Sequence, residues 1–297
     1  MKLPPSVRGP GARFLPLALV LLSLFFAGCV STNRTALAPE ASGRIKSVKA
    51  TVLVAQPEIA ADIETSNVAA AAGGGLIAAL VDVAIDAHRS KKAEEAITPL
   101  RDALVDFNVA ECLRATLEKG LGAQPPLAVT AVNLDLQMKP DAMRKSAETG
   151  GADAMLFISA DYRLTPACDR IRVMAKVTLL PKTGTADGKP LYENQFTTFR
   201  AVPSVQAGAI QKWSDNKGAL ARDALQSCFA ELAEMIVFDV PQGPEVNLLP
   251  KEKLTTSAPP VAPAMAAGRF IQRGAVEKKH GERTWVRLKT GELSSVD

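Results

Sequence analysis

The stretch AMLFISADYRLTPACDRIRVMAKVTLL, residues 154–180, decides the fold class of this chain. In its second half, apolar side chains occupy every other position, at Ile171, Val173, Ala175, Val177 and Leu179. This alternation is typical of a strand with one buried face, and the TPACD segment before it is rich in turn formers. A third strand-like run, LYENQFTTFR at 191–200, follows another turn-rich segment. The three runs predict an antiparallel meander of three strands.

Strands and helices are expected on both sides of this meander. Alternating apolar residues predict further strands, and apolar residues at helical spacing predict three helices. The strands are expected at 45–54 and 127–132, and the helices at 100–121, 141–148 and 218–237. This order of elements is typical of an α/β domain in which helices pack on a single mixed sheet. We expect that domain to span residues 45–240.

The amino terminus has the features of a lipoprotein signal peptide over residues 1–28. A basic start is followed by an apolar run at 14–26, which is the length that an export signal needs. The run ends in Phe26, Ala27 and Gly28, directly before Cys29. This arrangement resembles the bacterial lipobox, in which cleavage precedes the cysteine and its thiol carries diacylglycerol. The alternative is an ordinary secretory signal with an incidental cysteine.

Lipidation of Cys29 would determine the location of the mature chain. The acyl groups would bind outer-membrane lipid, and this covalent lipid is the only non-protein group that we expect. Val30 follows the cysteine where inner-membrane lipoproteins carry Asp, so the resemblance implies an outer-membrane protein that faces the periplasm. Residues 29–44 are small, polar and contain proline, which predicts a flexible tether.

The carboxyl-terminal part of the chain has a different composition. Residues 241–268 are rich in Pro and Ala without an apolar period, which predicts a linker. Residues 269–297 contain two strand-like pieces around KKHGER, and their seven cations and four acids give a net charge of +3. We expect a basic β-hairpin, which must pack on the domain or on a partner because a lone hairpin is marginally stable. Trp285 is expected to be exposed there and to contact a partner.

A glycine-rich apolar insertion is expected near residues 66–97. Its apolar run at 68–81 is shorter than the roughly 20 residues that span a bilayer. Gly73, Gly74 and Gly75 interrupt the run, and each costs about 1 kcal/mol relative to Ala in a helix. A transmembrane helix is therefore disfavoured. We expect a helix beginning near Gly75 that packs on the domain; the alternative is a small-residue contact between copies of the chain in a homo-oligomer.

Part of the domain resembles a known lipoprotein superfamily. A helix leads to Gly151-Ala152-Asp153 and a strand, and the turn of the next hairpin carries Thr183-Gly184. This order is similar to that of the superfamily containing the TolB amino-terminal domain, the curli-secretion-channel lipoprotein and the lipoprotein activators of penicillin-binding proteins. The resemblance covers roughly 45–240 and implies an α/β fold with a partner in the cell envelope. The insertion departs from the compact members.

The sequence contains no recognisable catalytic, cofactor or metal motif. It has no nucleophile elbow, its only histidines are His88 and His280, and AAGGGLIAAL lacks the Lys-Ser/Thr of a phosphate loop. Beyond Cys29 there are three cysteines and no C-x-x-C, so at most one disulfide forms among Cys112, Cys168 and Cys228. We therefore expect no enzyme activity. A net charge of +4 in an exported chain also argues against nucleic acid as a partner.

These observations favour a lipid-anchored, non-enzymatic protein that serves as an interaction or regulatory module and binds an unidentified envelope protein. One alternative is a subunit of an oligomeric secretion or channel assembly in the outer membrane. Another is an enzyme whose site is built from dispersed residues.

Overall fold

The computed structural model of the chain describes residues 33–62, 87–122, 127–135, 138–183, 189–202, 208–247, 255–256, 273–288 and 290–296. Residues Thr32–Asp297 form one compact unit. The expected signal peptide, the lipobox residues 26–28, Cys29 and the three glycines at 73–75 lie outside the described residues. In the part of the chain that is described, no helix is both long and apolar enough to cross a membrane.

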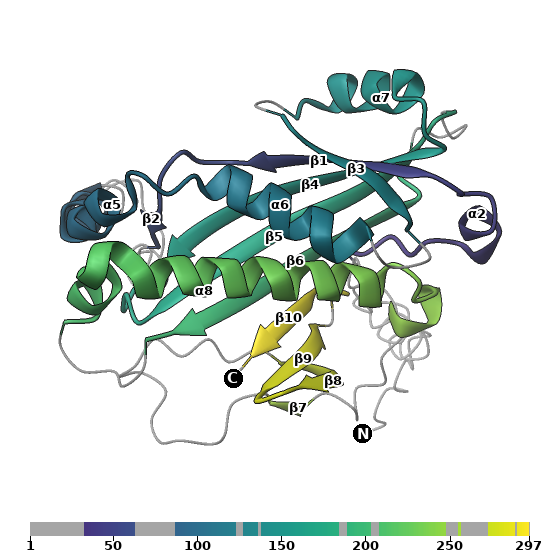
Figure 1. Cartoon of the computed structure of the whole chain (residues 1–297). Helices are drawn as coiled ribbons and strands as arrows, with labels where there is room; N and C mark the ends of the chain where they lie inside the picture. Colours follow the sequence, from purple (N-terminus) through teal and green to yellow (C-terminus); the bar gives the residue numbers. More distant parts are fainter. Residues whose placement is uncertain are drawn as a thin grey trace, which may run out of the picture. The chain divides into compact units, whose positions relative to one another are not determined.

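A single mixed sheet of ten strands forms the centre of the fold (Figure 1). Nine strands follow the order β3-β1-β4-β5-β6-β10-β9-β8-β7, and β2 pairs with β4 beyond the end of β1. The strands are β1 Val48–Val54, β2 Ala60–Ala61, β3 Val129–Leu134, β4 Ala154–Leu164, β5 Arg170–Pro181, β6 Tyr192–Ala201, β7 Thr255–Thr256, β8 Arg273–His280, β9 Arg283–Leu288 and β10 Leu293–Val296. The predicted meander is confirmed, because β4, β5 and β6 are antiparallel neighbours, while β1 runs parallel to β3 and β4. The expected α/β class is therefore correct.

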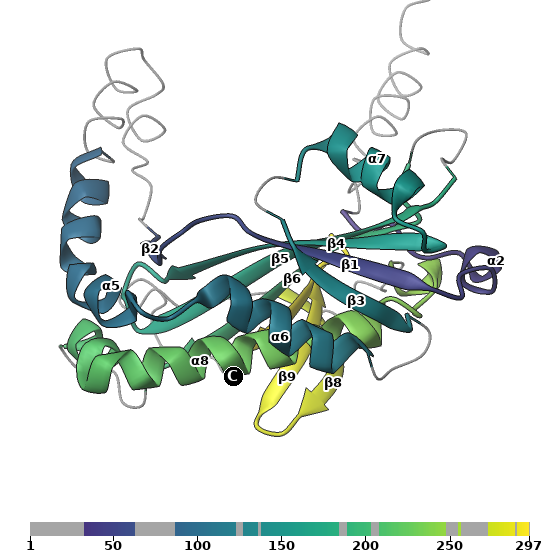
Figure 2. The ribbon, with the colours of Figure 1, turned by 45° about the horizontal axis from the view of Figure 1, so that its top comes forward.

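Two long helices cover one face of this sheet (Figures 1 and 2). They are α6, Val109–Gly122, and α8, Ala209–Asp239, whose backbone is kinked and non-helical at 215–218. The shorter α5, Thr98–Leu104, packs beside α8. The alternating residues of β5 point into this core, and none is more than 1 % exposed. The single helix expected at 100–121 is instead two helices, because Asn108 accepts a hydrogen bond from the backbone N–H of Glu111 (3.0 Å) and caps a new helix.

The other face of the sheet carries α7, Pro140–Thr149 (Figure 2). Pro140 occupies the first turn, and Gly151, with a φ of +74°, follows the carboxyl end of the helix as the sequence predicts. Asp153 accepts backbone hydrogen bonds from Lys46 and Ser47, each 3.0 Å long. These bonds lower the pKa of Asp153 and fix the start of β4 beside the start of β1. The Gly-Ala-Asp segment therefore joins α7 to the centre of the sheet.

The carboxyl-terminal strands extend the sheet of the domain. The predicted hairpin is confirmed as β8 and β9, and β10 continues from it and pairs in parallel with β6. Within the predicted linker, a 3-10 helix, η2, spans Pro244–Asn247, and β7 pairs with β8. The remaining short elements are α2, Pro39–Ser42, and a helical segment at 87–96. The sequence predicts that the hairpin packs either on the domain or on a partner, and in the structure it packs on the domain.

Candidate functional site

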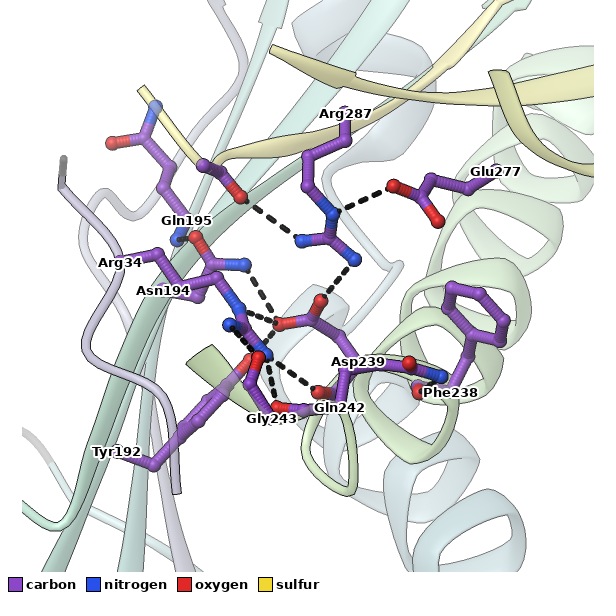
Figure 3. A network of polar contacts seen from close by, with 11 residues as sticks. Arg34, Tyr192, Asn194, Gln195, Phe238, Asp239, Gln242, Gly243, Glu277 and Arg287 are labelled. Atoms are coloured by element: carbon purple, nitrogen blue, oxygen red, sulfur yellow. Dashed lines mark hydrogen bonds and ion pairs between the residues drawn. The ribbon is translucent and has the colours of Figure 1, made fainter. Parts of the chain in front are cut away.

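A buried acidic residue at the carboxyl end of α8, Asp239, binds two arginines from distant parts of the chain (Figure 3). Its Oδ2 accepts hydrogen bonds from Arg34 Nε (3.0 Å), the Tyr192 hydroxyl (2.6 Å) and Asn194 Nδ2 (2.8 Å). Its Oδ1 lies 2.6 Å from Nη2 of Arg287, on β9. Both arginine side chains are fully buried. The Asp239 network therefore connects residues that are separated by more than 200 positions in the chain.

The charges in this network are balanced locally. Burial alone would raise the pKa of Asp239, but Arg287 and Arg34 outweigh it and the pKa is lowered. Burial, together with the neighbouring Asp239, holds the pKa of the Tyr192 hydroxyl well above its ordinary value. Asp239 is consequently a carboxylate and Tyr192 a neutral donor at neutral pH. Because these groups are shielded from solvent, the network is suited to holding segments together.

Residues 33–37, which we call the strap, are bound to the sheet. Thr35 exchanges two backbone hydrogen bonds with Glu193 of β6 (2.8 and 3.0 Å), and the Asn33 N–H donates to the carbonyl of Thr290 (2.7 Å). Arg34 also donates to the carbonyls of Asp239, Gln242 and Gly243, at the end of α8. The predicted tether at 29–44 thus differs from the structure where it is described, because Arg34 has a buried partner that composition cannot reveal.

A second buried carboxylate on α8, Glu231, holds the carboxyl-terminal strands. Arg200 Nη1 lies 2.6 Å from its Oε2, and Arg283 Nε lies 3.2 Å from the same oxygen. The Ser295 hydroxyl and the indole N–H of Trp285, the latter at 2.9 Å, donate to Oε1. Burial would raise the pKa of Glu231, but these partners, Arg283 first, lower it. Glu231 therefore binds residues of β6, β9 and β10 at once.

Trp285 is not the exposed partner contact that the sequence predicts. Its side chain is fully buried, with its ring 5.4 Å from Phe238 and stacked 5.4 Å from His280. Lys278 Nζ lies 4.8 Å from the centre of the indole. The prediction is wrong because β9 turns its Trp285 face toward α8, where Glu231 provides a partner for the indole N–H. Trp285 contributes to the attachment of the hairpin to the domain.

The candidate binding site is a groove beside α7, on the face of the sheet opposite α6 and α8. Its volume is about 380 Å³. Apolar side chains from α7, the segment before it, β1, β4, β5 and the segment before β6 form most of its lining: Leu53, Met138, Pro140, Met143, Phe157, Leu180 and Pro190. Phe157 belongs to a small apolar cluster that also holds Ala147 and Met155. The site is a partly open apolar surface on a rigid sheet, which is the form that binding sites commonly take.

Polar side chains also line this groove. Lys176 Nζ forms an ion pair with Glu193 Oε1 (3.0 Å), and Ser159 and Thr178 also line the groove. Arg144, on α7, lines it too and has no ion-pair partner among the residues that the structure describes. An unpaired guanidinium beside an apolar groove favours a ligand that places an acidic group next to apolar ones.

The remaining candidate groups do not converge. Cys112, Cys168 and Cys228 are free thiols, and burial raises the pKa of Cys228 to about 11. Among the described residues, no group of three His, Cys, Asp or Glu side chains is arranged to hold a metal ion. His280, of β8, stacks on Trp285 and lies 3.3 Å from Glu234.

Sequence reasoning missed the groove. The single available signal was the apolar run Met155-Leu156-Phe157-Ile158 in β4, because a strand that is apolar on both faces needs cover on both.

The sequence matches no protein-family model and no curated protein. Among solved structures, the chain is similar to a PelC dodecamer from Paraburkholderia phytofirmans, with 12% identity, a TM-score of 0.28 and coverage of 71% of this chain and 99% of that one. A variant PelC dodecamer from the same organism gives 12% identity, a TM-score of 0.26 and coverage of 68% and 97%. Likeness at this level carries no argument about function.

Proposed function

We propose that this protein is a lipid-anchored binding module of the outer membrane that faces the periplasm. Its lipid would be carried on Cys29, and the groove beside α7 would bind an apolar segment of another envelope protein. The groove is the observation that carries the proposal, because it combines an apolar floor with a cation that lacks an ion-pair partner among the described residues. The motif order of the TolB-like superfamily adds support from the sequence.

The chemistry of the lining specifies the kind of segment that would bind. Met138 and Met143 are flexible and polarizable, so they can adapt to different apolar side chains. Phe157 is only 3 % exposed and provides a fixed aromatic floor. Arg144 would pair with an acidic residue of the segment. We therefore expect the bound element to be short and apolar, with an Asp or Glu beside the apolar residues.

Photo-crosslinking in intact cells tests the proposal. A photoreactive amino acid at Met143 should produce one dominant adduct with a protein of the envelope. The same amino acid at Val105, which is apolar and 87 % exposed but lies away from the groove, is the matched control and should not produce that adduct.

Charge reversal makes the crosslinking result specific. Arg144→Glu should remove the adduct, whereas Lys145→Glu, on the exposed surface of the same helix and outside the groove lining, should leave it. Equal adducts at Met143 and Val105, or equal effects of the two charge reversals, would argue against the groove as the binding site.

The second candidate function is a subunit of an oligomeric outer-membrane assembly. One observation favours it: β3 lies at an edge of the sheet, and Leu134 at its end is 41 % exposed. Edge strands can pair with a second chain. Measurement of the particle mass in detergent tests this function, because a monomer would remove it.

A further inference from the structure

The strap and the groove share one residue, which links the proposed anchor to the proposed binding site. Thr35 is hydrogen-bonded through its backbone to Glu193, and the Glu193 side chain lines the groove. On the next strand, Lys176 forms an ion pair with Glu193 and also lines the groove. The point at which the chain enters the fold is therefore at the same end of the sheet as the groove.

Only a short connection separates the strap from the proposed lipid. Asn33 is already fixed, since its N–H donates to Thr290 and its Nδ2 donates to Glu292 Oε1 (2.9 Å). Four peptide links join Cys29 to Asn33, and a fully extended chain of that length spans about 14 Å. Strand spacing and rise place Asn33 roughly 8 Å from Glu193. The near end of the groove thus lies within roughly 22 Å of the lipid attachment.

The strap is held too firmly to lengthen this connection. Peeling it from the sheet would move Arg34 out of a fully buried ion pair and break its hydrogen bonds to three backbone carbonyls. It would also leave Asp239 with one arginine instead of two. The Asp239 network therefore acts on the anchor segment as a fixed attachment point.

The opposite end of the sheet lies much farther from the anchor. β6 runs from Tyr192 beside the strap to Ala201, a distance of about 30 Å at the rise of a strand. Arg200 faces Ile171, Ile171 faces Leu164, and β2 pairs with Leu164 at that end. Arg101 Nε of α5 donates to the Ile59 carbonyl, next to β2, so Val105 is also at the far end.

We propose that the strap holds the groove at the membrane surface, so that the partner segment binds at the level of the lipid headgroups. This inference rests on the proposed lipid anchor and specifies where the proposed partner is met. A partner segment that is far from the outer membrane would not reach the groove. The partner is accordingly an outer-membrane protein, or a peripheral one, that presents its acidic apolar segment beside the bilayer.

Headgroup quenching in vesicles tests this orientation with the full lipidated protein. A fluorescent amino acid replaces either Lys176, at the groove, or Val105, at the far end, and the vesicles contain lipid with a nitroxide on its headgroup. We expect quenching at position 176 to be at least threefold stronger than at position 105. Insertion of twenty Gly and Ser residues between Thr32 and Asn33 should largely remove the difference, because such a linker has an end-to-end distance of about 25 Å.

Three results would overturn the proposed orientation of the groove. Equal quenching at the two positions in the unmodified protein overturns the orientation, while crosslinking at Met143 would still support the groove as a binding site. A difference that persists after the insertion also overturns it, because the short connection would then not be its cause. Failure of the protein to float with the vesicles overturns both this inference and the proposed lipid anchor.

Discussion

Arg34→Ala should weaken the fold far more than its position near the amino terminus suggests. The change removes a buried partner of Asp239 and leaves the carbonyls of Gln242 and Gly243 without their donor. Removing one member of a buried ion pair costs about 3–5 kcal/mol. Asp239 keeps Arg287, so we expect the lower end, about 3 kcal/mol. For a domain of this size, that corresponds to a fall in Tm of about 6–12 °C.

Urea and thermal unfolding of the purified protein measure this loss, and amide exchange locates it. Exchange at Thr35 and Glu193 should accelerate, because their backbone hydrogen bonds hold the strap. Arg44→Ala is the matched control, since Arg44 is exposed, and it should change the free energy of unfolding by no more than about 0.5 kcal/mol. Equal effects of the two substitutions would refute the argument that Arg34 is a buried partner of Asp239.

Three further predictions concern Glu231, the pH dependence of stability and the contact between α6 and α8. Glu231→Gln should lower the free energy of unfolding by about 3 kcal/mol and shift tryptophan emission to longer wavelength as Trp285 becomes more exposed to water. Glu234→Gln, at an exposed position, should have neither effect. Urea titration measures the first effect and fluorescence the second. The pKa values of Asp239 and Glu231 are lowered by folding, so their stabilising contribution is present above their ordinary values of 3.8 and 4.5 and is lost as the pH falls through their lower values in the folded protein. In a series from pH 7 to pH 3, the urea concentration at the midpoint should therefore decrease once the pH is below about 5. A midpoint that does not change would contradict this balance of charges. Gly120→Ala should destabilise the protein by about 1–3 kcal/mol although Ala favours helices, because the new methyl group would lie 2.5 Å from Cβ of Ala233. Gly122→Ala should not destabilise it, because the nearest atom to its new methyl group is 3.6 Å away. If Gly120→Ala stabilised the protein, α6 and α8 would be less closely packed than this distance indicates.

The part of the fold that depends on local patterns could be predicted from the sequence. Alternation in β5 identified the residues that face the core beneath α8, because a strand of period two has only two faces. The Gly150-Gly151 stop of α7 could be predicted because the carboxyl end of a helix favours a left-handed glycine.

The features that depend on distant partners could not be predicted. Arg34 lies in a polar segment, and its burial depends on Asp239, 205 residues away. Trp285 and Val286 are adjacent and point to opposite faces, so the sequence alone does not show that Glu231 receives the indole N–H. The groove joins side chains from at least five separate segments, and none of them forms a motif.

The groove beside α7 is proposed to bind an acidic apolar segment. The most direct measurement is the Kd of the purified protein for a peptide that carries the segment crosslinked at Met143. Arg144→Glu should weaken binding about tenfold or more, equivalent to at least about 1.4 kcal/mol, because it replaces an attractive charge with a repulsive one. Lys145→Glu should leave the Kd within about twofold, since Lys145 does not line the groove. Equal Kd values for the two variants would contradict the account.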